Sequence, residues 1–162
     1  MRFWWVNQNQ TFEQELSGGY LWSPKRKANG ARNPFYEFMR EVAPGDLVLS
    51  FQGTFIRAIG VAQSFAYECP KPPEFGSTGP NWDLIGWSVD VQYHRLNHQI
   101  RPADHMANLL PHLPEKYSPL MRDGRGLQSV YLTSIAPPLM HAIADLIGHE
   151  AVSRTQFSWT RN

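Results

Sequence analysis

Short apolar runs separated by turn-forming residues fill the first part of the chain and predict short strands and helices. Residues 3–6 are aromatic and β-branched and end at the polar run NQNQ, so we expect a buried strand that begins a central sheet. Residues 11–16 predict one or two helical turns, which the following pair of glycines ends. Asn33 and Pro34 suit the N-cap and the first position of a helix whose apolar residues recur at helical spacing.

Alternating apolar residues predict strands in the middle of the chain. Residues 47–51 and 55–65 carry β-branched and aromatic side chains on either side of a turn at Gln52 and Gly53, which predicts a hairpin. The next segment, CPKPPEFGSTGPNW, is dense in proline and glycine and is expected to be a surface loop, neither a helix nor a central strand. Residues 86–96 then predict another strand.

Further short elements are expected toward the end of the chain. Residues 106–110 predict a short helix stopped by Pro111, and residues 130–135 predict a strand after a loop. Residues 138–147 have apolar side chains at helical spacing and are followed by Gly148, as a C-terminal helix should be. Strands mixed with short helices and an antiparallel hairpin predict an α+β domain around a curved mixed sheet or an open barrel.

Composition indicates one globular domain. The chain has 162 residues, 42% of them hydrophobic and 18% charged, which is enough for a sizeable core. No apolar run approaches the roughly 20 residues that cross a bilayer. The N-terminus lacks the basic start and apolar middle of a signal peptide, and a single cysteine, Cys69, cannot form an internal disulfide. We therefore expect a cytoplasmic protein without membrane contact, whose net charge of +1 confines any nucleic-acid contact to one face.

The sequence offers no recognisable catalytic or metal-binding motif. The six histidines are scattered, and none joins Cys69 at metal-ligand spacing. His94 and His98 lie four apart, in a predicted strand and just beyond its end, where that spacing does not bring them to a common helical face. There is no G-x-S-x-G elbow, Walker A loop or dinucleotide fingerprint. We expect no catalytic residue, no metal and no cofactor.

Tryptophans, amides and arginines lie beside glycine and proline turns in the first third, a mixture that a packed core does not need. It suits a pocket that stacks a flat, polar ligand such as a nucleobase and reads its edge with hydrogen bonds. Many aromatic side chains are still expected in the core, including Trp87 and one of the adjacent Trp4 and Trp5, which must point to opposite faces of a strand. Trp22, at a predicted strand end, and Trp82, in a predicted loop, are the preferred stacking residues.

A basic cluster follows Trp22 directly. Alone, such a run indicates a solvated loop, but beside an aromatic pocket it suits contacts to phosphates while one base is drawn out of a duplex. Lys116, in the segment PEKYSP, indicates either a rigid finger on the same face or a plain turn. Arg57, Arg122 and Arg125 would extend this face. The expected phosphate-binding residues are Lys25, Arg26, Lys27, Arg32 and Lys116.

Several motifs, which cover nearly the whole chain, resemble those of the EVE-type domain, a member of the PUA-like group found at the N-terminus of modification-dependent HNH restriction endonucleases. These motifs are FWWVNQ, GGYLWSPK, GARNPFYEFMREVAPGDLVLSF, IRAIGVA, PEFG, NW, GW and LPEKYSP. The resemblance implies a curved mixed sheet flanked by short helices, and DNA carrying 5-methylcytosine or 5-hydroxymethylcytosine as the partner. It implies that the modified base enters an aromatic pocket formed by Asn7, Trp22, Ser23, Phe51 and Trp82, which residues 31–33 and the GDLVLSF strand support.

The chain departs from those endonucleases in one respect. They carry a C-terminal nuclease domain with paired histidines and an asparagine, whereas this sequence ends at Asn162 without it, and the pair His149–Glu150 is not that motif. We expect residues 1–162 to form a single EVE-like domain without cleavage activity. It would be either the recognition part of a longer nuclease, with any homodimer formed through the missing nuclease domain, or a stand-alone reader.

Functions from different classes remain open at this point. The leading hypothesis is a binding module that flips a modified cytosine out of duplex DNA and stacks it on tryptophan. The second is a reader of modified RNA resembling YTH domains, which would prefer single strands because their bases are already unstacked. A stand-alone nucleotide-binding domain is a further alternative. An enzyme acting on a nucleotide is the least supported, because the sequence shows no nucleophile paired with a base.

Overall fold

The structure, a computed structural model, describes residues 1–151. Its first element, β1 (Phe3–Asn7), is buried along its whole length. β1 pairs in parallel with β3 (Leu47–Gln52) and antiparallel with β7 (Leu132–Ile135), so it lies inside the sheet. The aromatic and β-branched composition of this segment suits a strand covered on both faces. The predicted buried strand that begins the sheet is confirmed.

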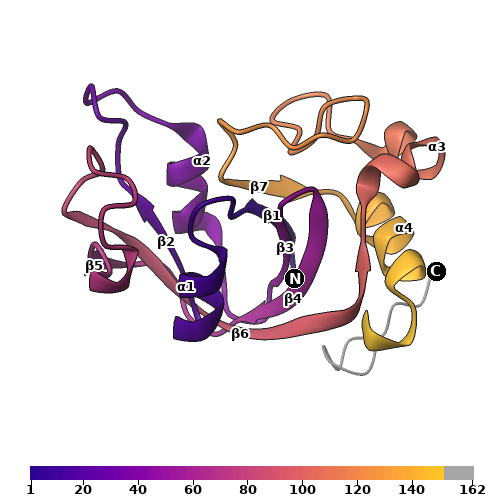
Figure 1. The fold of residues 1–162 in the computed structure, drawn as a ribbon, viewed down its shortest axis with the longest axis horizontal. Helices are drawn as coiled ribbons and strands as arrows, with labels where there is room; N and C mark the ends of the chain where they lie inside the picture. Colours follow the sequence, from indigo (N-terminus) through magenta and orange to yellow (C-terminus); the bar gives the residue numbers. More distant parts are fainter. Residues whose placement is uncertain (152–162) are drawn as a thin grey trace.

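The sheet has seven strands and curls into a half-barrel (Figure 1). Six of them follow the order β2-β6-β4-β3-β1-β7, and β5 pairs with β6 beside this path. The long β6 joins two parts of the sheet, because its first half pairs with β2 and β5 and its second half pairs with β4. The remaining strands are β2 (Tyr20–Pro24), β4 (Phe55–Ala62), β5 (Tyr67–Pro70) and β6 (Ile85–Ile100).

The strand pairing is irregular at two places in the curled sheet. The register shifts between Ser50 and Phe51 where β3 meets β4, and between Ile56 and Ala58 where β4 meets β6. Such shifts increase local twist and bend a strand, which helps a sheet to curve. The predicted α+β class, with a curved mixed sheet flanked by short helices, is confirmed.

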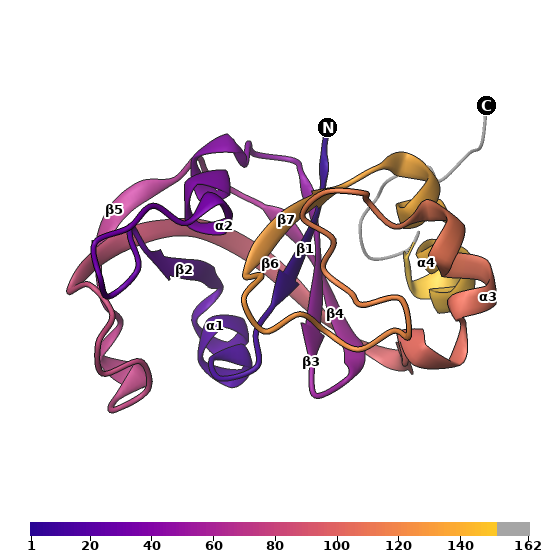
Figure 2. The same cartoon turned by 90° about the horizontal axis from the view of Figure 1, so that it is seen from above.

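The helices are short and lie around the sheet, with α1 and α2 at one end and α3 and α4 at the other (Figure 2). The α-helices are α1 (Phe12–Gly18), α2 (Pro34–Glu37), α3 (Met106–Leu109) and α4 (Pro137–Ile147). Turns of 3-10 helix cover Phe38–Glu41, Pro73–Phe75, Pro102–Asp104 and Leu110–His112. Within residues 1–151, no helix has the length and apolar character needed to span a membrane.

The predicted helix boundaries are largely confirmed. Asn33 caps α2, since its Oδ1 accepts a hydrogen bond of 2.9 Å from the backbone N–H of Phe35, and Pro34 is the first helical residue. α4 ends at Gly148, whose φ of 83° favours glycine. Pro111 does not end the helical segment, because a 3-10 turn over Leu110–His112 follows α3 directly. Proline fits near the start of this turn, where the backbone nitrogen needs no hydrogen-bond acceptor.

Both faces of the sheet are covered, and the adjacent Trp4 and Trp5 show this directly. Trp5 packs in a core with α3 and α4, whereas Trp4 packs in a second core with Met39 and Val42. The prediction that the two rings point to opposite faces is confirmed. The expectation that only one of them fills the core is wrong, because each face has its own core and both rings are fully buried.

Two segments differ from the sequence-based prediction. The proline-rich segment is not entirely a loop, because Cys69 and Pro70 belong to the edge strand β5 and Pro73–Phe75 forms a 3-10 turn. An edge strand accepts proline because one side of its backbone needs no partner. Trp22 does not lie at a strand end, because β2 continues through Ser23 to Pro24 by pairing with β6.

Candidate functional site

A cavity of about 630 Å³ opens where β1, β2 and the β3–β4 turn meet the loop that precedes β7. We call it the tryptophan cavity, because Trp22 and Trp82 both line it. The structure brings the whole expected pocket to this one place, since Asn7, Trp22, Ser23, Phe51 and Trp82 all contribute to the walls. The sequence-based choice did not include its other aromatic and polar lining residues, among them Gln10, Tyr36, Gln128, Ser129 and Tyr131.

Trp22 is part of a rigid wall. Its side chain exposes only 2% of its surface, and its indole Nε1–H donates a hydrogen bond of 3.1 Å to the carbonyl oxygen of Cys69. The ring also contacts Phe75 edge-on, with centroids 5.7 Å apart. Because β2 and β5 both hold it, the ring forms an almost fully buried backing of the cavity wall.

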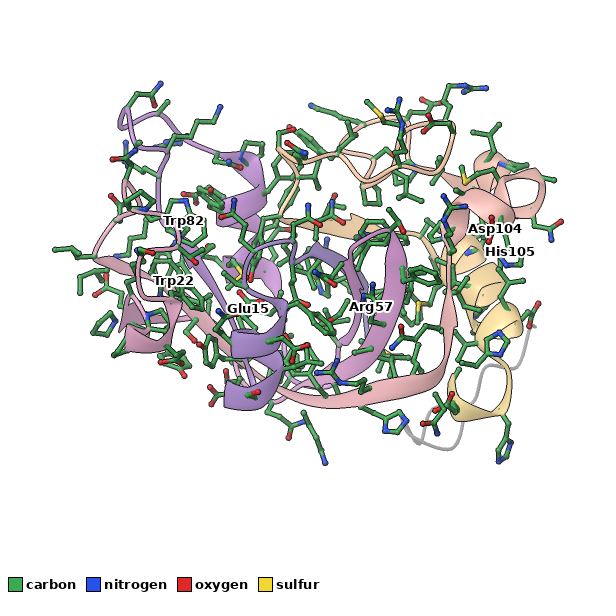
Figure 3. The ribbon with its side chains drawn as sticks, in the orientation of Figure 1. Glu15, Trp22, Arg57, Trp82, Asp104 and His105 are labelled. Atoms are coloured by element: carbon green, nitrogen blue, oxygen red, sulfur yellow. The ribbon has the colours of Figure 1, made fainter. Side chains whose placement is uncertain are left out.

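Trp82 is more accessible and lies in the loop before β6, as predicted. Its ring centroid is 6.3 Å from that of Trp22, with the planes tilted by 40°, and Figure 3 shows both rings on the same side of the molecule. The Nζ of Lys71 lies 5.6 Å from the Trp82 ring centroid and donates a hydrogen bond to the carbonyl oxygen of Gly79. Of the two tryptophans, Trp82 is therefore the one that a ligand can reach over a larger area.

Asn7 has its amide engaged within the protein. Its Oδ1 accepts a hydrogen bond of 2.8 Å from the indole of Trp5, and its Nδ2 donates to the carbonyl oxygens of Pro119 and Leu127. These bonds fasten the loop before β7 to the end of β1. Asn7 thus shapes the wall of the tryptophan cavity rather than leaving a donor pair free.

Ser23 and Phe51 also have partners within the wall. The Ser23 hydroxyl donates to the carbonyl oxygen of Pro24 at 2.9 Å. The Phe51 ring packs on Trp5, and a Cβ added to Gly126 would lie 2.7 Å from it, so glycine is required for this close approach. The exposed amides and hydroxyl at the mouth, from Asn9, Gln10, Gln128 and Ser129, are the polar groups open to a ligand.

A second cavity adjoins the first, and we call it the basic cavity because Arg26 and Lys27 line it. Tyr36 and Trp82 line both cavities, so they separate the two openings from one another at close range. Arg32 lies on the same loop, where its backbone pairs with that of Arg26. Part of the predicted basic cluster therefore lies beside the aromatic walls.

The other predicted basic residues are placed differently. Lys25 pairs with Glu68, and its Nζ lies 4.5 Å from the ring centroid of Trp87, so it is held against the sheet. Lys116 lies over the ring of Tyr117 at 4.8 Å, and neither of the two cavities includes it. The sequence could not separate these residues, because the spacing along a loop does not reveal where each side chain points.

Arg125 lines the tryptophan cavity, but its side chain pairs with Asp123 at 2.7 Å. Arg57 lines neither the tryptophan cavity nor the basic cavity. Its guanidinium donates to the carbonyl oxygen of Gln52 at 2.7 Å and to Gln99 at 2.9 Å. Through the first of these bonds Arg57 braces the β3–β4 turn, which forms part of the cavity rim.

A buried carboxylate, Glu15, lies behind the wall of the tryptophan cavity (Figure 3). Its Oε1 accepts hydrogen bonds from the Tyr131 hydroxyl at 2.6 Å and from the Trp22 backbone N–H at 3.3 Å. Burial raises the pKa of Glu15 to about 7, although the hydrogen bonds from Tyr131 and Gln8 oppose this shift. Nothing in the sequence pointed to this residue, because a glutamate in a polar helical turn normally indicates a solvated face.

In the described residues, no group of three or more histidine, cysteine, aspartate or glutamate side chains is arranged to hold a metal ion. The tryptophan cavity is characterised by its aromatic walls and polar mouth. This arrangement suits binding of a flat ligand by stacking and edge hydrogen bonds.

Comparisons with known proteins give structural matches only. No protein-family model matches the sequence, and no curated protein matches it. Human THYN1 protein, in complex with DNA containing 5-methylcytosine, is 14% identical over 93% of this chain and 99% of its own, with a TM-score of 0.61. A hypothetical protein from Leishmania major is 10% identical over 97% and 98% of the two chains, also with a TM-score of 0.61.

A further structural match is the Pho92 YTH domain in complex with m6A. It is 11% identical over 90% of this chain and 85% of its own, with a TM-score of 0.54. At such low identities these matches show a common fold, and they agree with the curled mixed sheet and short helices described above. The chain has the PUA-like fold.

Proposed function

We propose that this chain is a binding module for a modified nucleobase, most specifically 5-methylcytosine or 5-hydroxymethylcytosine flipped out of duplex DNA. The observation that carries the proposal is the tryptophan cavity, whose two indole rings lie 6.3 Å apart beside a mouth of exposed amides. Its volume of about 630 Å³ is in the range of ordinary small-molecule sites. The complexes of human THYN1 with 5-methylcytosine DNA and of the Pho92 YTH domain with m6A support a nucleic-acid ligand.

The energetics are consistent with this role. Flipping a base costs a few kcal/mol, and stacking on an aromatic side chain returns about 1–3 kcal/mol per base. Contacts to phosphates must supply much of the remainder, and Arg26 and Lys27 lie at the adjoining basic cavity. We assign them, with Arg32 on the same loop, to the DNA backbone. Lys25 and Lys116 would contribute only as secondary contacts, because Lys25 is already paired with Glu68 and Lys116 lies outside both cavities.

The finer assignment follows the resemblance in the sequence. On this proposal the chain acts as the specificity domain of a modification-dependent HNH endonuclease, or as a stand-alone reader in the cytoplasm, and it does not cleave DNA itself. A second candidate is a reader of modified RNA, which the likeness to the Pho92 YTH domain favours. The two candidates differ in strandedness, because single-stranded RNA needs no flipping step.

Binding measurements on the full 162-residue chain test the proposal. Fluorescence anisotropy would compare identical duplexes that carry cytosine, 5-methylcytosine, 5-hydroxymethylcytosine or 6-methyladenine at one position. The separated strands and an RNA oligonucleotide with 6-methyladenine complete the set. We expect tighter binding to a modified-cytosine duplex than to the unmodified duplex. Equal affinity for every duplex would overturn the proposal, and preference for the modified RNA would favour the second candidate.

A further inference from the structure

We propose that Glu15 is a positioning residue for the tryptophan cavity, and that its ionised carboxylate holds the backbone of Trp22 and the side chain of Tyr131 in the geometry that accepts a base. The affinity for the modified base then depends on the protonation state of Glu15. This inference rests on the function proposed above, because it concerns the same cavity.

The geometry around Oε1 carries the inference. Tyr131 Oη lies 2.6 Å from Oε1, the Trp22 backbone nitrogen lies 3.3 Å from it, and the Trp22 nitrogen also lies 3.2 Å from Tyr131 Oη. These three groups come from α1, β2 and the segment before β7, and Tyr131 is 116 residues away from Glu15 in the sequence. Trp22 and Tyr131 both line the tryptophan cavity, whereas Glu15 is fully buried behind them. One carboxylate oxygen therefore connects two parts of the wall.

The second carboxylate oxygen of Glu15, Oε2, accepts a hydrogen bond from Gln8. The Gln8 Nε2 donates to Glu15 Oε2 and to Tyr93 Oη, the latter at 3.2 Å. Across the described residues, Gln8 Oε1 is buried and has no hydrogen-bond partner. An amide rotated by 180° would turn this oxygen toward a protonated Glu15 and accept its proton in a hydrogen bond. The site thus has two hydrogen-bond arrangements, one for each protonation state of Glu15.

The titratable groups that face Glu15 are tyrosines. In the part of the chain that the structure describes, its side-chain partners include no lysine, arginine or histidine. Burial raises the pKa of Tyr93 and of Tyr131 well above the usual tyrosine value, and it also raises the pKa of Tyr20. These hydroxyls stay protonated near neutrality, whereas the pKa of Glu15 is raised to about 7. Glu15 is therefore the group in this network that changes charge near pH 7.

The direction of the effect follows from hydrogen-bond strength. An ionised acceptor forms bonds roughly twice as strong as a neutral one, so the carboxylate holds Tyr131 and the Trp22 amide more firmly than the carboxylic acid does. A wall that is already ordered loses less conformational entropy when a ligand binds. Affinity for the modified base should therefore rise as the pH rises through 7.

The first measurement needs no ligand. The backbone amide signal of Trp22 in a ¹H–¹⁵N NMR spectrum would be followed from pH 5.5 to 8.5. We expect it to titrate near pH 7 in the parent and to stay constant in Glu15→Gln, because glutamine keeps the shape of the protonated acid but cannot ionise. Glu13→Gln is the matched control, since Glu13 lies on the same helix and pairs with the exposed Arg95. A Trp22 amide that does not titrate in the parent would overturn the inference.

The second measurement is affinity for the modified duplex over the same pH range. We expect the parent and Glu13→Gln to bind about three- to tenfold more tightly at pH 8.5 than at 5.5, and Glu15→Gln to bind equally at both. Tyr131→Phe should weaken this dependence, because it removes one of the two groups that Oε1 holds. If the parent prefers the modified duplex at every pH with unchanged affinity, the inference fails and the proposed function stands. If no pH gives a preference for the modified duplex, the proposed function itself fails.

Discussion

The indole rings of Trp22 and Trp82 lie 6.3 Å apart with a tilt of 40°, yet the two residues have different structural roles. Trp22 belongs to β2 and is almost completely buried, with its Nε1–H bonded to Cys69. Trp82 lies in the loop before β6 and is only partly buried. Substitutions at the two positions should therefore affect stability and binding to different extents.

Replacement of Trp82 by alanine is expected to reduce binding of the modified duplex about tenfold or more and to leave the domain folded, because a stacked base gains about 1–3 kcal/mol from such a ring. Trp82→Phe should recover part of the affinity, since it keeps an aromatic face. Fluorescence anisotropy gives the affinity, and far-UV circular dichroism checks the fold. Binding of Trp82→Ala that equals the parent would exclude this ring from the ligand site.

Trp22→Ala is expected to destabilise the domain by about 3–5 kcal/mol, as truncation of a buried tryptophan leaves a cavity and an unpaired carbonyl oxygen. This result differs from the sequence-based expectation, in which Trp22 lay at a strand end and served, like Trp82, as a stacking residue. Urea denaturation of the parent and the variant measures the difference. A change below about 1 kcal/mol would mean that the Trp22 ring contributes little to the core.

Local patterns in the sequence predict most of the elements. The apolar run at residues 3–6 and the capping pair Asn33–Pro34 determine a strand and a helix start through short-range chemistry. Trp22 and Trp82 were selected from their place in the sequence, whereas Asn7, Ser23 and Phe51 were assigned to the cavity only through the resemblance to known domains. Spacing alone could not bring Asn7, Trp22 and Phe51 together, because their proximity depends on how distant strands pair.

The sequence did not predict the burial of Glu15 or the ion pair of Lys25, and the reasons are physical. Glu15 is polar and stands in a helical turn, so nothing local indicates that three elements bury it. Lys25 looks equivalent to Arg26 in the sequence, yet only the folded sheet places Glu68 beside it. In both cases the decisive partner comes from a distant part of the chain, whereas sequence patterns report mainly on neighbouring residues.

The raised pKa of Glu15 also predicts how stability depends on pH. The folded state binds a proton at a pKa of about 7, whereas the ordinary value is 4.5, so the folded state holds more protons than the unfolded state between these values. The contribution of Glu15 to stability is fully present below pH 4.5 and is lost as the pH rises through 7. The difference in melting temperature between the parent and Glu15→Gln should change across this range and level off above it. A constant difference would show that Glu15 has no shifted pKa.

Glu150 predicts the opposite dependence at low pH. Its carboxylate accepts backbone hydrogen bonds from Asn97 and His98 at 3.0 Å, and these bonds lower its pKa from 4.5 to about 2. The stabilisation is present above pH 4.5 and is lost as the pH falls toward 2. Glu150→Gln should cost about 1–2 kcal/mol at pH 7, measured by urea denaturation, and less at pH 3. A loss that is equally large at both values would show that the charge of Glu150 is not responsible.

The basic cavity leads to a prediction that separates affinity from discrimination. Arg26 and Lys27 line this cavity beside Trp82, and contacts to phosphates carry no information about base modification. The double variant Arg26→Glu/Lys27→Glu should therefore weaken binding to modified and unmodified duplexes by similar factors. It should also flatten the dependence of log affinity on log salt concentration by roughly one unit for each phosphate that the variant no longer neutralises.

Arg101→Glu is the matched control for that double variant, because Arg101 pairs with Asp104 near α3 and neither cavity includes it. Reversal of its charge should leave the salt slope close to that of the parent, since only charges near the bound backbone release counterions. An unchanged slope in the double variant would place Arg26 and Lys27 away from the DNA. Loss of the preference for the modified base in the double variant would instead show that these side chains line the base site, because phosphate contacts alone cannot distinguish one base from another.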